Sequence, residues 1–151
     1  MTKERMIQEI ASGAPIRSLV WKEPFASLML QGKIETRTWS TKYRGFVLIC
    51  AGKKGYPITS LLELCGKHQL NRLLSRKLSF QGGSAIAIGR LVDCRPMKRE
   101  DEDSTFVRYV PESCLYCHVY EDVIPITPFP FKGHQGWRIQ NGIEILNALN
   151  L

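Results

Sequence analysis

Basic and aromatic residues gather between Gly32 and Lys54. Only Glu35 opposes the positive charges in this stretch, and two aromatic residues, Trp39 and Tyr43, lie among them. The basic residues are Lys33, Arg37, Lys42, Arg44, Lys53 and Lys54. Cations neutralise phosphates, and exposed aromatic rings stack on unpaired bases. The combination favours a site for a nucleotide or a single-stranded nucleic acid. The alternative is that the two rings pack against the body of the domain and the lysines only line its rim.

A glycine-rich segment, Lys132 to Gly136, is a second candidate site. Its backbone N–H groups can approach a phosphate, but the segment lacks the strand–loop–helix order and the lysine position of a P-loop. We interpret it as the border of a binding cleft and expect Lys132 to contact nucleic acid. His134 can act as an acid or base near neutral pH, or it can simply be solvated.

The cysteines do not form a convincing metal or haem site. Five cysteines, an odd number, predict reduced thiols rather than a disulfide framework in a chain that we expect to stay inside the cell. Cys114, Cys117 and His118 spell the haem-attachment pattern, but that attachment requires export. A zinc site that recruits Cys94 or His134 lacks a second ligand pair, and strand-like alternation places Cys114 and Cys117 on opposite faces. We expect no metal and no cofactor.

The composition excludes several classes of protein. Of the 151 residues, 44% are hydrophobic and 23% are charged, which is typical of a globular domain and not of a disordered chain or a coiled coil. The longest apolar runs fall far short of the roughly 20 residues that a transmembrane helix needs. The charged N-terminus, MTKERMIQEI, is unlike a secretory signal. We expect one domain over residues 1–151, cytoplasmic, or nuclear in a eukaryote, with no membrane partner.

The net charge indicates the kind of partner. Lysine and arginine total 21 against 14 acidic residues, which gives a net charge of +7. Four of the acids form the run Glu100 to Asp103, which we expect to be a solvated loop tip. The rest of the surface is therefore more strongly positive and favours a polyanion. Alternatively, the charge only keeps the protein in solution. The sequence leaves the oligomeric state open.

Hydrophobic periodicity predicts an α+β domain in which strands predominate. Strand patterns occur at residues 16–21, 34–39, 46–51, 84–94 and 115–120. Helices are predicted at residues 3–11, after Pro24, from about residue 59, and within residues 140–151. In the second strand, strict alternation places Ile34, Thr36 and Thr38 on one face and Glu35, Arg37 and Trp39 on the other.

Three segments of the sequence resemble the ASCH domain family, which is related to the PUA fold. They are WKEPFASLMLQGKIETRTWSTKYRGFVLICAG at residues 21–52, GSAIAIGRLVDC at 83–94 and FPFKGHQGW at 129–137. The segments occur in family order, and the resemblance spans residues 16–139. A helical extension at residues 1–15 and a closing helix at residues 140–151 lie outside it.

The resemblance implies a small PUA-like β-barrel with flanking helices and a cleft near the turn at Gly32. PUA-like relatives bind RNA, and some ASCH domains are implicated in DNA binding, ribonuclease action or deacetylation of a modified cytidine. We therefore expect this chain to bind RNA or a modified nucleotide in a basic, aromatic-lined cleft. The residues expected to contact it are Lys33, Arg37, Trp39, Lys42, Tyr43, Arg44, Lys53 and Lys132.

The resemblance also leaves a hydrolase open as the alternative function. In the amidohydrolase members, a lysine and a threonine spaced K-x-x-T act with a glutamate, and Lys33 and Thr36 match this spacing. A lysine in an apolar cleft can lose its proton and activate a threonine hydroxyl. The glutamate has no clear counterpart, because a regular strand points Glu35 away from Thr36 and Asp93 is only a loose substitute. The sequence does not decide between binding, hydrolysis of N4-acetylcytidine or RNA, and a protein-interaction role.

Overall fold

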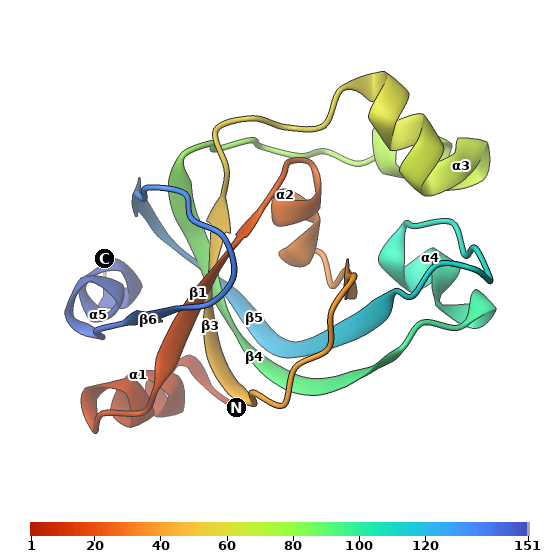
Figure 1. The fold of residues 1–151 in the computed structure, drawn as a ribbon. Helices are drawn as coiled ribbons and strands as arrows, with labels where there is room; N and C mark the ends of the chain where they lie inside the picture. Colours follow the sequence, from red (N-terminus) through yellow and green to blue (C-terminus); the bar gives the residue numbers. More distant parts are fainter. Residues whose placement is uncertain (151) are drawn as a thin grey trace.

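The computed structural model describes residues 1–150 and has one six-stranded mixed sheet at its centre (Figure 1). The strand order is β2-β5-β4-β3-β1-β6. The strands are β1 (Ile16–Trp21), β2 (Glu35–Arg37), β3 (Gly45–Ala51), β4 (Ser84–Pro96), β5 (Tyr116–Pro130) and β6 (Arg138–Gln140). Only β1 and β3 pair in parallel, and the other neighbours are antiparallel.

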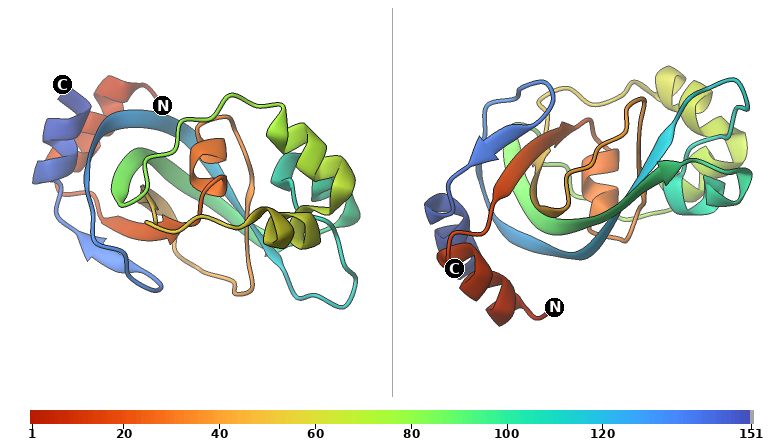
Figure 2. Two further views of the ribbon diagram at one scale, coloured as in Figure 1. Left: turned by 90° about the horizontal axis from the view of Figure 1, so that it is seen from above. Right: turned by 60° about the horizontal axis from the view of Figure 1, so that its bottom comes forward.

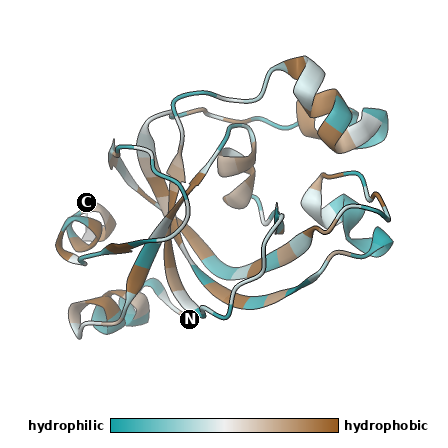
Figure 3. Ribbon diagram, viewed as in Figure 1, coloured by the Kyte–Doolittle hydropathy of each residue, from teal (hydrophilic) through white to brown (hydrophobic). Residues whose placement is uncertain are grey.

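The central position of β3 follows from its continuous apolar sequence. A strand that is covered on both faces needs apolar side chains on both. In β3, Val47, Ile49 and Ala51 belong to one buried cluster, while Phe46, Leu48 and Cys50 belong to the other. Figure 3 shows the hydrophobic residues gathered along the central strands. The sheet therefore separates two cores.

Helices cover both faces of the sheet. On the outer face, α1 (Lys3–Ala11) and α5 (Ile143–Asn150) pack together and bury Met6, Ile10 and Ile145. On the inner face, every residue of the short helix α2 (Phe25–Met29) is buried. Figure 1 shows α2 enclosed by the curve of the sheet, with α1 and α5 outside it.

The sheet curves strongly but is not closed into the predicted barrel (Figure 2). The long strands β4 and β5 shift register at three places, and each such irregularity bends a pair of strands. Within residues 1–150, β2 pairs only with β5 and β6 only with β1, so the two edges remain apart. The prediction of a barrel was wrong on this point, because the edge strands have only three residues each and do not meet.

The end of the molecule opposite α1 and α5 is formed by α3 (Ile58–Leu74), the 3-10 helix η1 (Arg99–Asp101) and α4 (Glu102–Thr105) (Figure 1). The helix α3 changes direction at Gly66, where φ is 76°. The proline-rich residues 125–130, which we did not assign to a strand, extend β5.

The acidic run at residues 100–103 is not a solvated loop tip, contrary to our expectation. The buried Asp101 carboxylate accepts hydrogen bonds from both terminal nitrogens of Arg95 and from the Lys98 N–H, each at 2.8 Å. The hydrogen bonds from Arg95 lower the pKa of Asp101 to about 2. Asp103 accepts a further bond from Gln69 Nε2 at 2.7 Å. The run therefore fastens α4 to β4 and α3.

Among the helices of residues 1–150, we find none with the length and apolar character needed to cross a bilayer.

Candidate functional site

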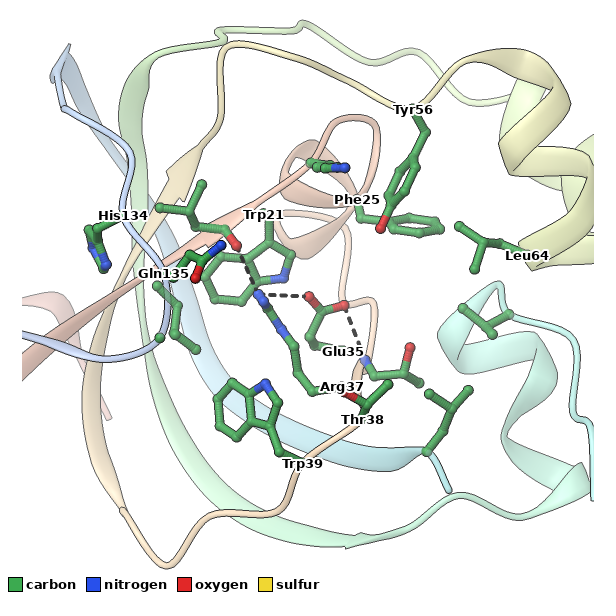
Figure 4. A pocket seen from close by; sticks show the side chains of 17 residues that line it. Trp21, Phe25, Glu35, Arg37, Thr38, Trp39, Tyr56, Leu64, His134 and Gln135 are labelled. Atoms are coloured by element: carbon green, nitrogen blue, oxygen red, sulfur yellow. Dashed lines mark hydrogen bonds and ion pairs between the residues drawn. The ribbon is translucent and has the colours of Figure 1, made fainter. Parts of the chain in front are cut away.

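A cavity of about 480 Å³ opens on the inner side of the sheet. Its lining comes from the end of β1, from β2, from residues 134–136, which precede β6, and from α3 and the segment between α4 and β5. The wall is rich in aromatic side chains, and Figure 4 shows how they surround the space. These are Trp21, Phe25, Trp39 and Tyr56. The cavity therefore lies between the two unpaired edges of the open sheet.

A buried carboxylate organises the floor of the cavity. Glu35 Oε1 lies 2.9 Å from Lys33 Nζ and accepts the Thr36 N–H at 3.1 Å, while Glu35 Oε2 lies 3.1 Å from Arg37 Nη2. Burial alone raises the pKa of Glu35, but the charges of Lys33 and Arg37 and these hydrogen bonds outweigh it, so the pKa is lowered. Glu35 therefore stays ionised between two cations.

Lys33 supports this carboxylate and does not reach the cavity. Its side chain is fully buried. Its ammonium also donates to the Ile34 carbonyl at 3.0 Å and lies 4.6 Å from the centre of the Phe25 ring. Because Glu35, a carbonyl and an aromatic face already surround the ammonium, Lys33 does not contact a phosphate in this arrangement.

Arg37 spans the floor of the cavity, and only its Nη2 bonds to the protein within residues 1–150. Its Nη2 donates to the Val20 carbonyl at 3.1 Å, and its guanidinium lies 4.9 Å from the centre of the Trp21 ring. Figure 4 shows Arg37 between Trp21 and Glu35. Within residues 1–150, the buried Arg37 Nε and Trp21 Nε1 atoms have no hydrogen-bond partner. A buried donor without a partner costs about 1–3 kcal/mol.

His118 holds Trp39 in place. The buried His118 Nε2 lies 2.9 Å from the Trp39 carbonyl, which fixes this nitrogen as the donor. The two rings meet edge to face at 4.9 Å, and Trp137 contacts Trp39 at 5.7 Å. Burial lowers the pKa of His118, although the bond to the Trp39 carbonyl opposes the shift. A neutral histidine therefore supports the Trp39 wall.

The third side of the cavity is the segment at residues 134–136. His134 Nε2 lies 2.8 Å from the hydroxyl of Ser18, which is completely buried on β1. This bond fixes the segment against the sheet. Burial lowers the pKa of His134. Because Ser18 is inaccessible, the pair positions the loop and is not a nucleophile with its base.

The structure separates the residues that the sequence grouped together. Thr36, Arg37 and Trp39 line the cavity, whereas Lys33 lies buried behind it. The Tyr43 hydroxyl donates to the Phe46 carbonyl, and its ring packs against Trp137, so it supports the wall indirectly. The remaining predicted residues lie elsewhere: Lys42 and Arg44 are exposed in the segment before β3, and Lys53 and Lys132 line a separate hollow.

Several residues of the cavity were absent from our predictions. Trp21 was assigned only to a strand, Phe25 and Tyr56 were not singled out, and Gln135 was only part of the glycine-rich segment. Trp21 ends β1 directly before the segment that leads to Phe25, so its position beside the motif was the available signal. Tyr56 carried no such signal, because its contact with Phe25, at 5.5 Å between ring centres, depends on the tertiary fold.

Comparison with known proteins identifies the fold. No family model matches the chain, and no curated protein matches it in sequence. Among solved structures, the crystal structure of an ASCH protein from Zymomonas mobilis matches with a TM-score of 0.55, covering 90% of this chain and 94% of that one. The chain has the fold of an ASCH domain. The sequence identity of 13% shows the fold alone.

The Glu35 network generates a prediction about stability. The Glu35→Gln variant should lose about 3–5 kcal/mol of unfolding free energy in urea titrations, because it leaves the buried Lys33 ammonium without a counter-charge. The double variant Lys33→Met/Glu35→Gln should recover part of this loss. The exposed pair Arg5–Glu9 is the control, and Glu9→Gln should cost at most about 1 kcal/mol. Equal effects at Glu35 and Glu9 would contradict the role of the network.

The lowered pKa of His118 generates a prediction about pH. Its ordinary pKa is 6.5, and the folded state favours the neutral ring, so stability is complete above pH 6.5 and falls as the pH drops below that value. In urea titrations from pH 8 to pH 5, His118→Gln should lose less stability than the wild type. His134 titrates in both proteins and does not affect the difference. The exposed His68 is the control, and a His118→Gln profile identical to that of His68→Gln would refute the prediction.

Proposed function

We propose that the cavity binds a base of RNA, or a free or modified nucleotide, with Trp39 as a stacking surface. The observation that carries the proposal is the aromatic wall of the cavity around Arg37, and in residues 1–150 the buried Arg37 Nε and the neighbouring Trp21 Nε1 have no hydrogen-bond partner. Ligand sites are mostly apolar clefts of about 300–1,000 Å³ with a few well-placed polar groups, and this cavity fits that description.

The chemistry of the lining favours a planar ligand with an acceptor edge. Stacking on an aromatic side chain contributes about 1–3 kcal/mol per base. Both Glu35 oxygens are already engaged, because Oε1 accepts hydrogen bonds from Lys33 and Thr36 and Oε2 forms the ion pair with Arg37, so donors are the polar groups of the floor that are left for a ligand. Ring nitrogens and carbonyl oxygens of a nucleobase can accept from such donors.

The mouth of the cavity suits a phosphate. Lys22 is exposed, lines the cavity and holds its ammonium 5.1 Å from the centre of the Tyr56 ring. The net charge of +7 adds a long-range attraction for polyanions. These features support RNA and DNA alike, and the family resemblance places RNA first.

Hydrolysis of a nucleoside or of RNA is the second candidate, and the surroundings of Thr36 favour it. Thr36 lines the cavity, and its N–H contacts the Glu35 carboxylate, the acidic group that the K-x-x-T pattern lacked in the sequence. Against this role, Lys33 is fully buried and does not reach the cavity. Binding therefore explains the geometry better than a Lys33–Thr36 catalytic pair does.

The binding proposal is tested with single-stranded RNA hexamers of each base, measured by fluorescence anisotropy. Replacing Trp39 by alanine should weaken binding roughly tenfold or more, as expected for the loss of a stacking contact of about 1–3 kcal/mol. Phe80→Ala, which removes an exposed ring outside the cavity, should bind like the wild type. Binding that is equal in the Trp39 and Phe80 variants would remove the cavity from the interaction.

The hydrolase candidate is tested by incubating the protein with N4-acetylcytidine and measuring the release of cytidine and acetate. Water adds across the amide bond in this reaction, so one cytidine should form for each acetate. Thr36→Val keeps the volume of the side chain and removes the hydroxyl, and it should abolish turnover if the candidate is correct. Absence of turnover in the wild type, with this nucleoside and with RNA, would eliminate it.

A further inference from the structure

A second hollow, of about 630 Å³, lies next to the cavity and carries three lysines. It is formed by residues 52–54 after β3, Gly83 before β4, and residues 130–133 at the end of β5. The lysines are Lys53, Lys54 and Lys132, and all three are exposed. The only side chains of the lining besides these are Pro130 and Phe131.

The charge of this hollow is uncompensated. In the part of the chain that the structure describes, no acidic residue lines it, and none of its lysines takes part in an ion pair. By contrast, the arginines of β4, Arg90 and Arg95, both pair with aspartates. Three free ammonium groups around one depression attract an anion with several charges.

The backbone beneath the lysines is tightly held. The Gly83 N–H donates to the Ala51 carbonyl at 2.8 Å, and the Phe131 N–H donates to the Gly83 carbonyl at 2.9 Å. At Gly82, a Cβ atom would lie 3.0 Å from the Gly52 carbonyl oxygen, so the two loops approach closely. The three segments are therefore joined to one another, so the backbone that carries the lysines is held in place.

The hollow and the cavity share a border. The segment after β5 contributes Lys132 and Gly133 to the hollow and then His134 to the cavity. On the opposite side, the Gly52 N–H of the hollow donates to the carbonyl of Trp21, a cavity residue, at 2.8 Å. In the view of Figure 1, the segment between β5 and β6 passes in front of β1 and β3. An extended ligand can therefore occupy both depressions.

We propose that the hollow binds the sugar-phosphate backbone of a single-stranded polynucleotide, one base of which occupies the cavity. This inference rests on the proposed function and narrows it, because the ligand is then a strand and not a free nucleotide. Lys53, Lys54 and Lys132 contact successive phosphates, and the His134 segment lies between the base and the backbone beyond it.

The test uses the full chain and two probes, an RNA hexamer and an abasic hexamer that has the backbone but no bases. The triple variant Lys53→Gln/Lys54→Gln/Lys132→Gln should weaken binding of both probes roughly tenfold or more at 0.1 M salt. The slope of log affinity against log salt should become shallower by about 2, since each single-strand phosphate contact contributes about 0.7. A DNA hexamer in parallel tells the two nucleic acids apart.

A matched control loses the same charge elsewhere. Lys3→Gln/Lys67→Gln/Lys77→Gln removes three exposed lysines outside both depressions and should have at most a small effect. If the two triple variants bind the hexamers equally, the inference of a backbone site in the hollow is overturned. In that case, weaker RNA binding by Trp39→Ala in the same assay would show that the base site in the cavity exists without a backbone site. If only the hollow variant weakens the abasic probe, the backbone site is supported even when Trp39→Ala has no effect.

Discussion

The buried carboxylate of Glu35 is the interaction on which the site depends. It lies between the Lys33 ammonium and the Arg37 guanidinium, and both cations reach it from the same short segment of chain. Two charges that leave water together are tolerated only when they are paired and fully hydrogen-bonded. Lys33 meets this condition by facing inward. Arg37 meets it only in part, because its buried Nε has no hydrogen-bond partner within residues 1–150. One carboxylate thus makes one cation structural and leaves the other available to a ligand.

The open edge of the sheet also shapes the site. A closed barrel pairs every strand and fills its interior with side chains. Here β2 and β6 are too short to meet, and the space between them is lined by Trp21, Arg37 and His134. The Ser18–His134 bond joins residues 116 positions apart and fixes the segment that borders this space. The failure to close is therefore what gives the domain a cavity.

The sequence predicted the elements well and the roles of individual charges less well. The apolar run in β3 depends on local periodicity, which a single sequence carries. The strand predicted at residues 34–39 is shorter, β2 (Glu35–Arg37), and Thr36, Arg37 and Trp39 all line the cavity, although strict alternation placed Thr36 on the opposite face. The burial of Lys33 does not follow from periodicity, because it depends on Phe25 and Glu35 meeting it in the turn before β2. Asp101 is a similar case, since a run of acids predicts solvent exposure until Arg95 on a neighbouring strand is known to face it. In both cases the three-dimensional arrangement of nearby partners decides the outcome, and periodicity does not reveal it.

The basic residues divide into two groups with different tasks. In residues 1–150, the ion pairs include six arginines but only one lysine, Lys33. A guanidinium has a planar array of donors that suits fixed partners, whereas an exposed ammonium on a flexible stem adapts to a mobile anion. The net positive charge of the chain is therefore expressed mainly through unpaired lysines. Three of these lysines line one depression beside an aromatic cavity, an arrangement in which charge and stacking can act on the same ligand.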